Sequence, residues 1–535
     1  MGRRLLASFQ SLHTEAEKAD LQKLSCLLAA MTESGLQAVV GTPSEVSEDS
    51  AQDCLDSLFL ERLLEMMTQM KAIRPEIVRG IPVHRFLRRM PCKGLAKQHR
   101  IFYGRSKVTK QLDEFWSHSW RTKAWLKYVN ILFLNNGFPA FVVGTLCALV
   151  AFSLSLAGIL PLQRTVGPAN AWCTIAGSIG YYMTLLLWPS RKLAFLDIAC
   201  INQEDETQKS EALLSMGAFL RCSKSLLVLW DETYVARLWC IFEMAGFLHS
   251  KGPRADKSVL VCPVFVGPAL FAGNLGLSVL LLALLCADLP LFPWAGIFIS
   301  AMVFPCMVLF AYVVLVHCRS IDVVQHQVRH FTFEHSLCHC CESGHVDDNG
   351  GEVSCDRLII FRCISAWFGS VDAFESLVQT RLLKTLVCQL ANQVFSYWRI
   401  VQATIPAAWA ILDLHESRQD AAAAVLQTML AAVNYPFCVL PICSLLMLRM
   451  AYGVRSLGHS KWTQWLLSTT LIAVESLLFG AYFLCEQALR QLSDDHFGNW
   501  LPAHLVALIL MGAVTLVLWR HLPAIEMHWD STSNS

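Results

Sequence analysis

Long uncharged runs of apolar residues constrain the fold of this 535-residue chain more than any other feature. A helix that crosses a bilayer takes roughly 20 mainly apolar residues. Strong runs cover residues 137–160, 171–188, 263–287 and 291–316, and weaker ones cover 397–414, 421–448, 463–485 and 501–519. We therefore expect an α-helical multi-pass bundle in the lipid bilayer, with seven or eight spans.

The composition supports the membrane class. The chain is 54% hydrophobic and 16% charged, whereas soluble proteins carry about one quarter charged residues. Its net charge of +1 gives no reason to expect a nucleic-acid partner. The 21 cysteines are scattered and several lie inside apolar runs, which favours reduced thiols over a disulfide framework.

Basic residues next to the first span predict the orientation. Between Glu76 and Asp113 the chain has many lysines and arginines and no acidic residue. Cytoplasmic loops carry such an excess, so we expect a cytoplasmic N-terminal part. The loop at 449–461 is basic and the one at 486–495 is mostly acidic, which fits eight spans with both ends inside. With seven spans the C-terminus would lie outside.

A polar island between the apolar runs has the pattern of alternating strands and helices. Residues 192–197, 225–230 and 258–266 are short apolar strands, and residues 207–221 and 237–249 are the helices between them. This order predicts a doubly wound α/β domain with a parallel sheet. Functional groups of such sheets gather at the carboxyl ends of the strands, here residues 197–206 and 231–234.

Two motifs of this island, and a third upstream of the first apolar run, resemble the TIR-like superfamily, including its fungal heterokaryon-incompatibility relatives. They are Phe-Leu-Asp-Ile-Ala-Cys-Ile-Asn-Gln at 195–203, Tyr-x-x-Arg-Leu-Trp-Cys-x-x-Glu at 234–243, and Phe-Trp-Ser-His-Ser-Trp at 115–120, which is similar to the first strand of such domains. Similar arrangements occur in multi-pass protist proteins. The resemblance implies that the first two spans form a membrane hairpin between the first and second strands.

These features divide the chain into segments. We assign 1–110 to a helical N-terminal region with a basic linker, 111–266 to a TIR-like domain interrupted by a membrane hairpin at 137–188, 263–316 to a second membrane hairpin, 317–396 to a cytosolic segment containing Cys and His, 397–520 to a C-terminal membrane bundle and 521–535 to a tail. In the first segment, apolar residues at helical spacing between 60 and 70 predict a packing face.

The TIR-like resemblance also implies a candidate active site. In NAD-cleaving members a glutamate of this pattern contacts the nicotinamide ribose, and the matching residue is Glu243. A fixed carboxylate stabilises the positive charge that develops as nicotinamide leaves. The pocket candidates around it are Ser117, His118, Asp197 and Trp239. NAD would then be the substrate.

Other roles remain open for the same residues. Glu243 can cap a helix or pair with Arg237 or Lys224, Trp239 can pack, and Asp197 can cap a turn. Many relatives act only as interaction modules that bind other TIR-like domains or themselves, and the interrupted first helix argues against a complete NAD pocket. We therefore expect a signalling or assembly platform, with a membrane-tethered NAD hydrolase as the alternative.

Two further groups of residues are candidates for function. Cys338, Cys341, His345 and Cys355 offer the thiolate and imidazole ligands that tetrahedral zinc prefers, with ordinary reduced cysteines as the alternative reading. Glu475 lies inside the seventh apolar run, where ionisable residues mark functional sites. It supports a third hypothesis, a transporter or channel built on the C-terminal bundle.

Overall fold

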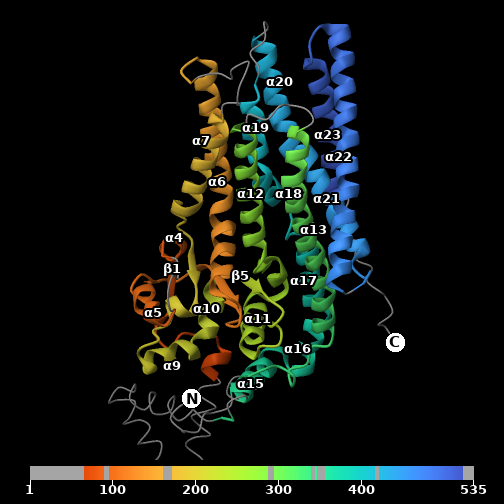
Figure 1. Cartoon of the computed structure of the whole chain (residues 1–535). Helices are drawn as coiled ribbons and strands as arrows, with labels where there is room; N and C mark the ends of the chain where they lie inside the picture. The colour runs from red at the N-terminus through yellow and green to blue at the C-terminus, as the bar shows by residue number, and fades with distance from the viewer. Residues whose placement is uncertain are drawn as a thin grey trace, which may run out of the picture.

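The protein consists of a small sheet at one end of a bundle of long helices (Figure 1). The computed structural model describes residues 65–89, 95–160, 171–286, 294–338, 341, 344–345, 356–415, 421–458 and 460–521. The sheet and its short helices lie at the lower end in Figure 1, and the apolar helices extend upward from it. The chain is therefore a mixed protein, mostly helical, as the sequence predicts.

Six helices of the described chain are long and apolar enough to cross a membrane. They are α6 (Ala124–Leu156), α12 (Val266–Cys286), the apolar part of α13 (Val303–Arg329), the segment Ala422–Val454, α22 (Lys461–Phe497) and α23 (Leu501–His521). Leucines on these helices are strongly exposed, for example Leu477 and Leu516, as expected for side chains in lipid. These helices support a multi-pass membrane protein.

The Asn434-Tyr435-Pro436 sequence does not interrupt the span in which it lies. Helix α20 (Ala421–Asn434) passes through a π-helical turn, η4 (Tyr435–Val439), into α21 (Leu440–Val454). Proline lacks a backbone N–H and removes one helical hydrogen bond. A π-turn absorbs such a defect without ending the helix.

The other two expected spans are shorter or broken. Residues 171–188 form α7 (Trp172–Leu187), which has 16 residues, and residues 397–414 form α18 (Tyr397–Thr404) and α19 (Pro406–Asp413). Pro406 cannot donate to the carbonyl of Gln402. The side-chain amide of Asn274 donates to that oxygen instead, at 3.0 Å. A count of seven or eight spans thus stays a prediction.

The sheet is mixed instead of wholly parallel. Strands β3 (Leu112–His118), β4 (Leu193–Phe195), β5 (Ser223–Trp230) and β6 (Val259–Pro263) are parallel in the order β4-β3-β5-β6. This is the 2-1-3-4 order of doubly wound sheets. Strand β1 (Arg79–Pro82) then adds antiparallel to β4, and β2 (Lys107–Val108) adds antiparallel to β1.

The expected basic linker is therefore part of the domain. It supplies β1, α4 (Val83–Leu87), α5 (Leu95–Tyr103) and β2. Its buried residues include Ile81 and Val83, both completely inaccessible to solvent. These elements are too short to show a hydrophobic period, and the many basic residues conceal them in the sequence.

Helices connect the parallel strands as the sequence predicts, with some changes of boundary. Between β4 and β5 lie α8 (Asp197–Cys200), α9 (Glu206–Leu214) and α10 (Met216–Cys222). The expected single helix at 207–221 ends at Ser215, whose Oγ accepts a hydrogen bond from the Ile73 N–H at 3.1 Å. Helix α11 (Leu238–Lys251) and the 3-10 turn η2 (Gly252–Ser258) connect β5 to β6.

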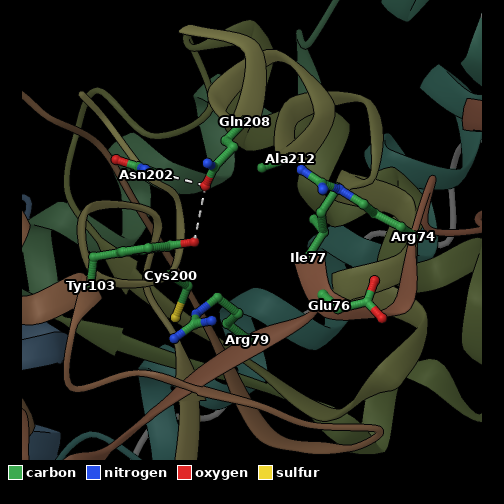
Figure 2. A pocket seen from close by; sticks show the side chains of 9 residues that line it. All are labelled: Arg74, Glu76, Ile77, Arg79, Tyr103, Cys200, Asn202, Gln208 and Ala212. Carbon is green, nitrogen blue, oxygen red and sulfur yellow. Dashed lines mark hydrogen bonds between the residues drawn. The ribbon is translucent and has the colours of Figure 1, made fainter. Parts of the chain in front are cut away.

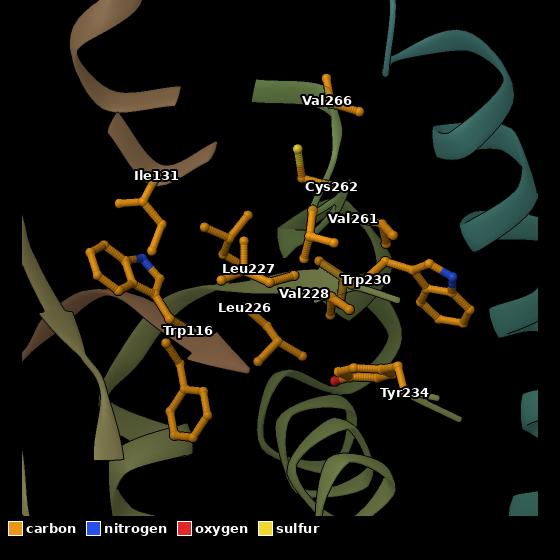
Figure 3. Close-up of a cluster of buried hydrophobic side chains, with 14 of the residues drawn as sticks. Trp116, Ile131, Leu226, Leu227, Val228, Trp230, Tyr234, Val261, Cys262 and Val266 are labelled. Carbon is orange, nitrogen blue, oxygen red and sulfur yellow. The ribbon is translucent and has the colours of Figure 1, made fainter. Parts of the chain in front are cut away.

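The sheet and the long helices share one hydrophobic core. Figure 3 shows Ile131 of α6 next to Trp116 of β3, and Val266 of α12 on the same side of the sheet as Cys262 of β6. The buried Asn130 side chain of α6 stabilises the junction between the sheet and α12, because its Oδ1 accepts a hydrogen bond from the Gly267 N–H at 2.8 Å. A strand therefore passes into a membrane helix without a flexible linker.

The expected cytosolic segment at 317–396 packs against the same domain. It contains the end of α13 (Trp294–Arg329), α15 (Asp356–Phe368), α16 (Val371–Leu377), the π-turn η3 (Val378–Leu382) and α17 (Leu383–Asn392). Gln389 of α17 pairs with the outer edge of β6. Its Oε1 accepts from the Val261 N–H at 2.7 Å, and its Nε2 donates to the Val259 carbonyl at 2.6 Å.

Candidate functional site

Ser117 and Glu243 meet at the carboxyl edge of the parallel sheet. Ser117 lies near the end of β3, and Glu243 lies on the second turn of α11, which follows β5. The Ser117 hydroxyl donates to the Glu243 carboxylate at 2.5 Å. The Tyr234 hydroxyl is 2.7 Å from the same serine oxygen. The structure thus brings together two of the predicted site residues and adds Tyr234.

Burial determines the protonation of this acid. Ser117 and Tyr234 are 1% and 0% exposed. Burial raises the pKa of Glu243 from 4.5 to about 8, the hydrogen bond from Ser117 opposes the rise, and the negative charge of Asp197 adds to it. Glu243 is therefore mainly a neutral acid at pH 7, which can donate a proton but offers little negative charge.

The neighbouring thiol is unreactive. Cys240 lies one turn before Glu243 on α11 and is buried. Burial, reinforced by the negative charge of Glu243, raises the pKa of the Cys240 thiol well above its ordinary value of 9.0. Its sulfur is 3.6 Å from the His118 carbonyl. A protonated thiol in this position is a packing group, because the thiolate is the nucleophilic form.

His118 and Asp197 lie at the same edge of the sheet. Burial lowers the pKa of His118 below 6.5, although the negative charges of Asp197 and Asp231 oppose this. The imidazole is therefore neutral at pH 7. The Asp197 carboxylate accepts a hydrogen bond from the Ile198 N–H at 2.7 Å. The negative charge of Asp197 acts to raise the pKa of both His118 and Glu243.

Trp239 and Lys224 have partners other than Glu243. The indole N–H of Trp239 donates to Asp356 of α15 at 3.2 Å, so its polar edge is directed to that helix. Lys224 pairs with Asp113 at 2.7 Å. The hypothesis that Lys224 pairs with Glu243 is therefore wrong.

The proposed zinc ligands are only partly within the described chain. Cys338 is buried and Cys341 is partly buried, and His345 adopts a positive φ of 60°. Cys355 lies outside the described residues. Within the described chain, no group of three or more Cys, His, Asp or Glu side chains is placed to hold a metal ion. The zinc hypothesis stays a prediction.

The intramembrane acid Glu475 is buried in the helical bundle. It is 5% exposed, and the thiol of Cys443 is its side-chain neighbour. Buried Asp413 and His504 also have polar neighbours: Asp413 caps α7, and His504 Nδ1 lies 3.8 Å from Glu486. The transporter hypothesis still has Glu475 as its candidate residue.

Comparison with known proteins adds no relative. No family model, curated protein or solved structure matches the chain. The sequence placed Tyr234 at the carboxyl edge of the sheet, within residues 231–234, but it was not named among the pocket candidates. The signal for its role was its position directly after β5, at the carboxyl edge of the sheet.

Proposed function

We propose that this protein is a membrane-embedded signalling or assembly platform, in which a degenerate TIR-like α/β domain is held at the cytoplasmic face by seven or eight spans. The basic residues before α6 support this orientation. The domain acts by binding a partner, either another TIR-like domain or a second copy of this chain.

The observation that carries this proposal is the difference between the two edges of the sheet. The β6 edge is sealed by Gln389. The opposite edge is β2, which has a hydrogen-bonded neighbour on one side within the described sheet. Val108 of β2 is 52% exposed. Strand β2 has only two residues and includes Lys107, which limits backbone pairing with another strand. A partner would therefore contact the exposed side chains of β2, and the domain is sealed on one edge and exposed on the other.

A second copy of the chain is the partner that can be tested directly. The full chain, labelled with a fluorophore, is reconstituted in liposomes over a range of protein densities, and energy transfer reports association. Val108→Glu places a charge at the free edge. We expect its association to be roughly tenfold weaker, which corresponds to about 1.4 kcal/mol.

Leu358→Glu is the matched control, because Leu358 is also exposed, at 48%, but belongs to α15. It should associate as the wild type does. A wild-type chain that stays monomeric at every density would remove the self-assembly proposal. Equal loss in both variants would remove β2 as the interface.

NAD hydrolysis is the second candidate, and the contact between Ser117 and Glu243 favours it. A protonated Glu243 differs from the carboxylate that the resemblance implies, so bound NAD would have to lower its pKa. Purified protein in lipid is incubated with NAD and nicotinamide is measured. Release that disappears in Glu243→Gln supports the hydrolase. No release from folded wild type removes it and leaves the platform unaffected.

A further inference from the structure

A pocket opens beside the carboxyl end of β4. It has a volume of about 150 Å³, and its walls include residues of β1, α5, α8 and α9. Ser117, Tyr234 and Glu243 are not among the residues that line it. Its polar lining residues are Arg74, Glu76, Arg79, Tyr103, Asn202 and Gln208. It is therefore distinct from the TIR-like candidate site.

Two arginines are held in fixed positions in its wall. Arg74 donates through Nε and Nη2 to the buried carboxylate of Glu211, at 2.9 and 2.5 Å. Arg79 donates through Nε and Nη2 to Ser106, at 2.8 and 2.9 Å. Its guanidinium also lies 4.6 Å from the centre of the Tyr103 ring. In both arginines, Nη1 is not used by any hydrogen bond between described residues.

Two arginines and one acid, Glu76, lie in the wall of this pocket, and Arg79 is the charged group in it that favours an anion. Glu211 offsets the charge of Arg74, whereas Arg79 has neutral partners, Ser106 and Tyr103. Figure 2 shows Arg74 and Arg79 on different sides of the pocket and the carboxylate of Glu76 turned away from Tyr103. An anion between the two arginines would meet preorganised N–H groups, whose ordering requires little further loss of entropy.

The remaining wall offers neutral polar and apolar groups. The Gln208 amide oxygen accepts from Tyr103 at 3.3 Å and from Asn202 at 3.2 Å, and Gln208 Nε2 donates to Asp205 at 2.7 Å. Ile77 and Ala212 supply carbon surface. Such a wall suits the hydroxylated carbon chain of a small metabolite.

We propose that this pocket binds a small phosphomonoester. A tetrahedral phosphate can accept hydrogen bonds from two guanidiniums that approach from different directions, whereas a flat carboxylate is best matched by one guanidinium fork. Cofactor and drug pockets have volumes of roughly 300–1,000 Å³. The smaller volume here therefore selects a compound of a few carbons over a dinucleotide.

Glycerol 3-phosphate is the probe, and inorganic phosphate and succinate are the comparison ligands. Binding to the full chain in lipid nanodiscs is measured by calorimetry. We expect glycerol 3-phosphate to bind more tightly than phosphate, and succinate to bind weakest. Arg79→Gln removes a charged donor and should weaken binding at least about tenfold. Arg100→Gln removes an exposed positive charge from α5 outside the pocket and should have little effect.

A second variant, which fills the pocket, keeps the test valid if Arg79→Gln does not fold. Ala212→Leu leaves both arginines in place and fills the cavity, and thermal unfolding without ligand shows whether each variant is folded. Loss of binding in a folded Ala212→Leu supports the site. The proposal is overturned if wild type does not bind glycerol 3-phosphate at concentrations up to about 10 mM. It is also overturned if phosphate or succinate binds as tightly, or if both folded pocket variants bind as the wild type does.

Discussion

Asp413, the last residue of α19, caps the first turn of α7 through Thr174. Its Oδ2 accepts from the Thr174 N–H at 2.8 Å and from the Thr174 hydroxyl at 2.7 Å. Its Oδ1 accepts from the Cys173 N–H at 2.8 Å. The N-cap residue of α7, Ala171, has no side-chain acceptor. A carboxylate from a distant part of the chain thus satisfies the free N–H groups that begin this short helix.

Asp413→Ala should therefore destabilise the protein. Loss of a helix cap costs about 0.5–2 kcal/mol, and Asp413→Asn should cost less because one oxygen remains. Thermal unfolding of the full chain in nanodiscs measures both. Asp495→Ala, an exposed acid near the end of α22, is the control. Equal melting temperatures for Asp413→Ala and the control would contradict the capping role.

A second prediction follows from the close packing between α7 and α19. A Cβ on Gly177 would lie 2.5 Å from Cδ2 of Trp409, whereas a Cβ on Gly276 of α12 would meet nothing within 4 Å. Gly177→Ala should destabilise the chain by about 1–3 kcal/mol through overpacking. Gly276→Ala should be neutral or stabilise it by up to about 1 kcal/mol. Unfolding in the same nanodiscs tests the pair, and an equally stable Gly177→Ala would show that α7 and α19 are not in close contact.

These contacts show where sequence reasoning succeeds and where it stops. The long spans and parallel strands could be predicted, because each element carries its own hydrophobic period. The meeting of Ser117 and Glu243 was predictable from the rule that strand ends gather at one edge. The partners of Asp413 and Gln389 were not, because such contacts depend on how distant helices pack. Strands β1 and β2 were missed for their shortness.

A third prediction concerns Gln389 and the stability of the β6 edge. Gln389→Ala leaves the Val261 N–H and the Val259 carbonyl without their partners, and each unsatisfied buried group costs about 1–3 kcal/mol. Hydrogen exchange of the peptide that contains β6 should become faster. Lys384→Ala changes an exposed residue of the same helix and should leave the exchange unchanged. Unchanged exchange in Gln389→Ala would mean that the amide does not seal the edge.

The last prediction concerns Glu243, the partly buried acid of the candidate site, and the effect of pH. The pKa of Glu243 is about 8 in the folded protein against an ordinary value of 4.5, so the folded state holds this proton more tightly than the unfolded state does. The stability that this group contributes is fully present below about pH 4.5 and is lost as the pH rises through 8. The melting temperature of wild type should therefore fall between pH 5 and pH 9.

Glu243→Gln keeps the shape of the acid but cannot ionise, so its melting temperature should fall less over that range. Glu204→Gln, at an exposed position, should follow the wild type. Ser117→Ala removes the hydrogen bond that lowers the pKa of Glu243 in the folded protein, so its loss of stability should begin at the same pH as in wild type but continue to a higher pH. If wild type and Glu243→Gln have parallel pH profiles, Glu243 is not held as a neutral acid, and the carboxylate required for NAD cleavage is present at neutral pH.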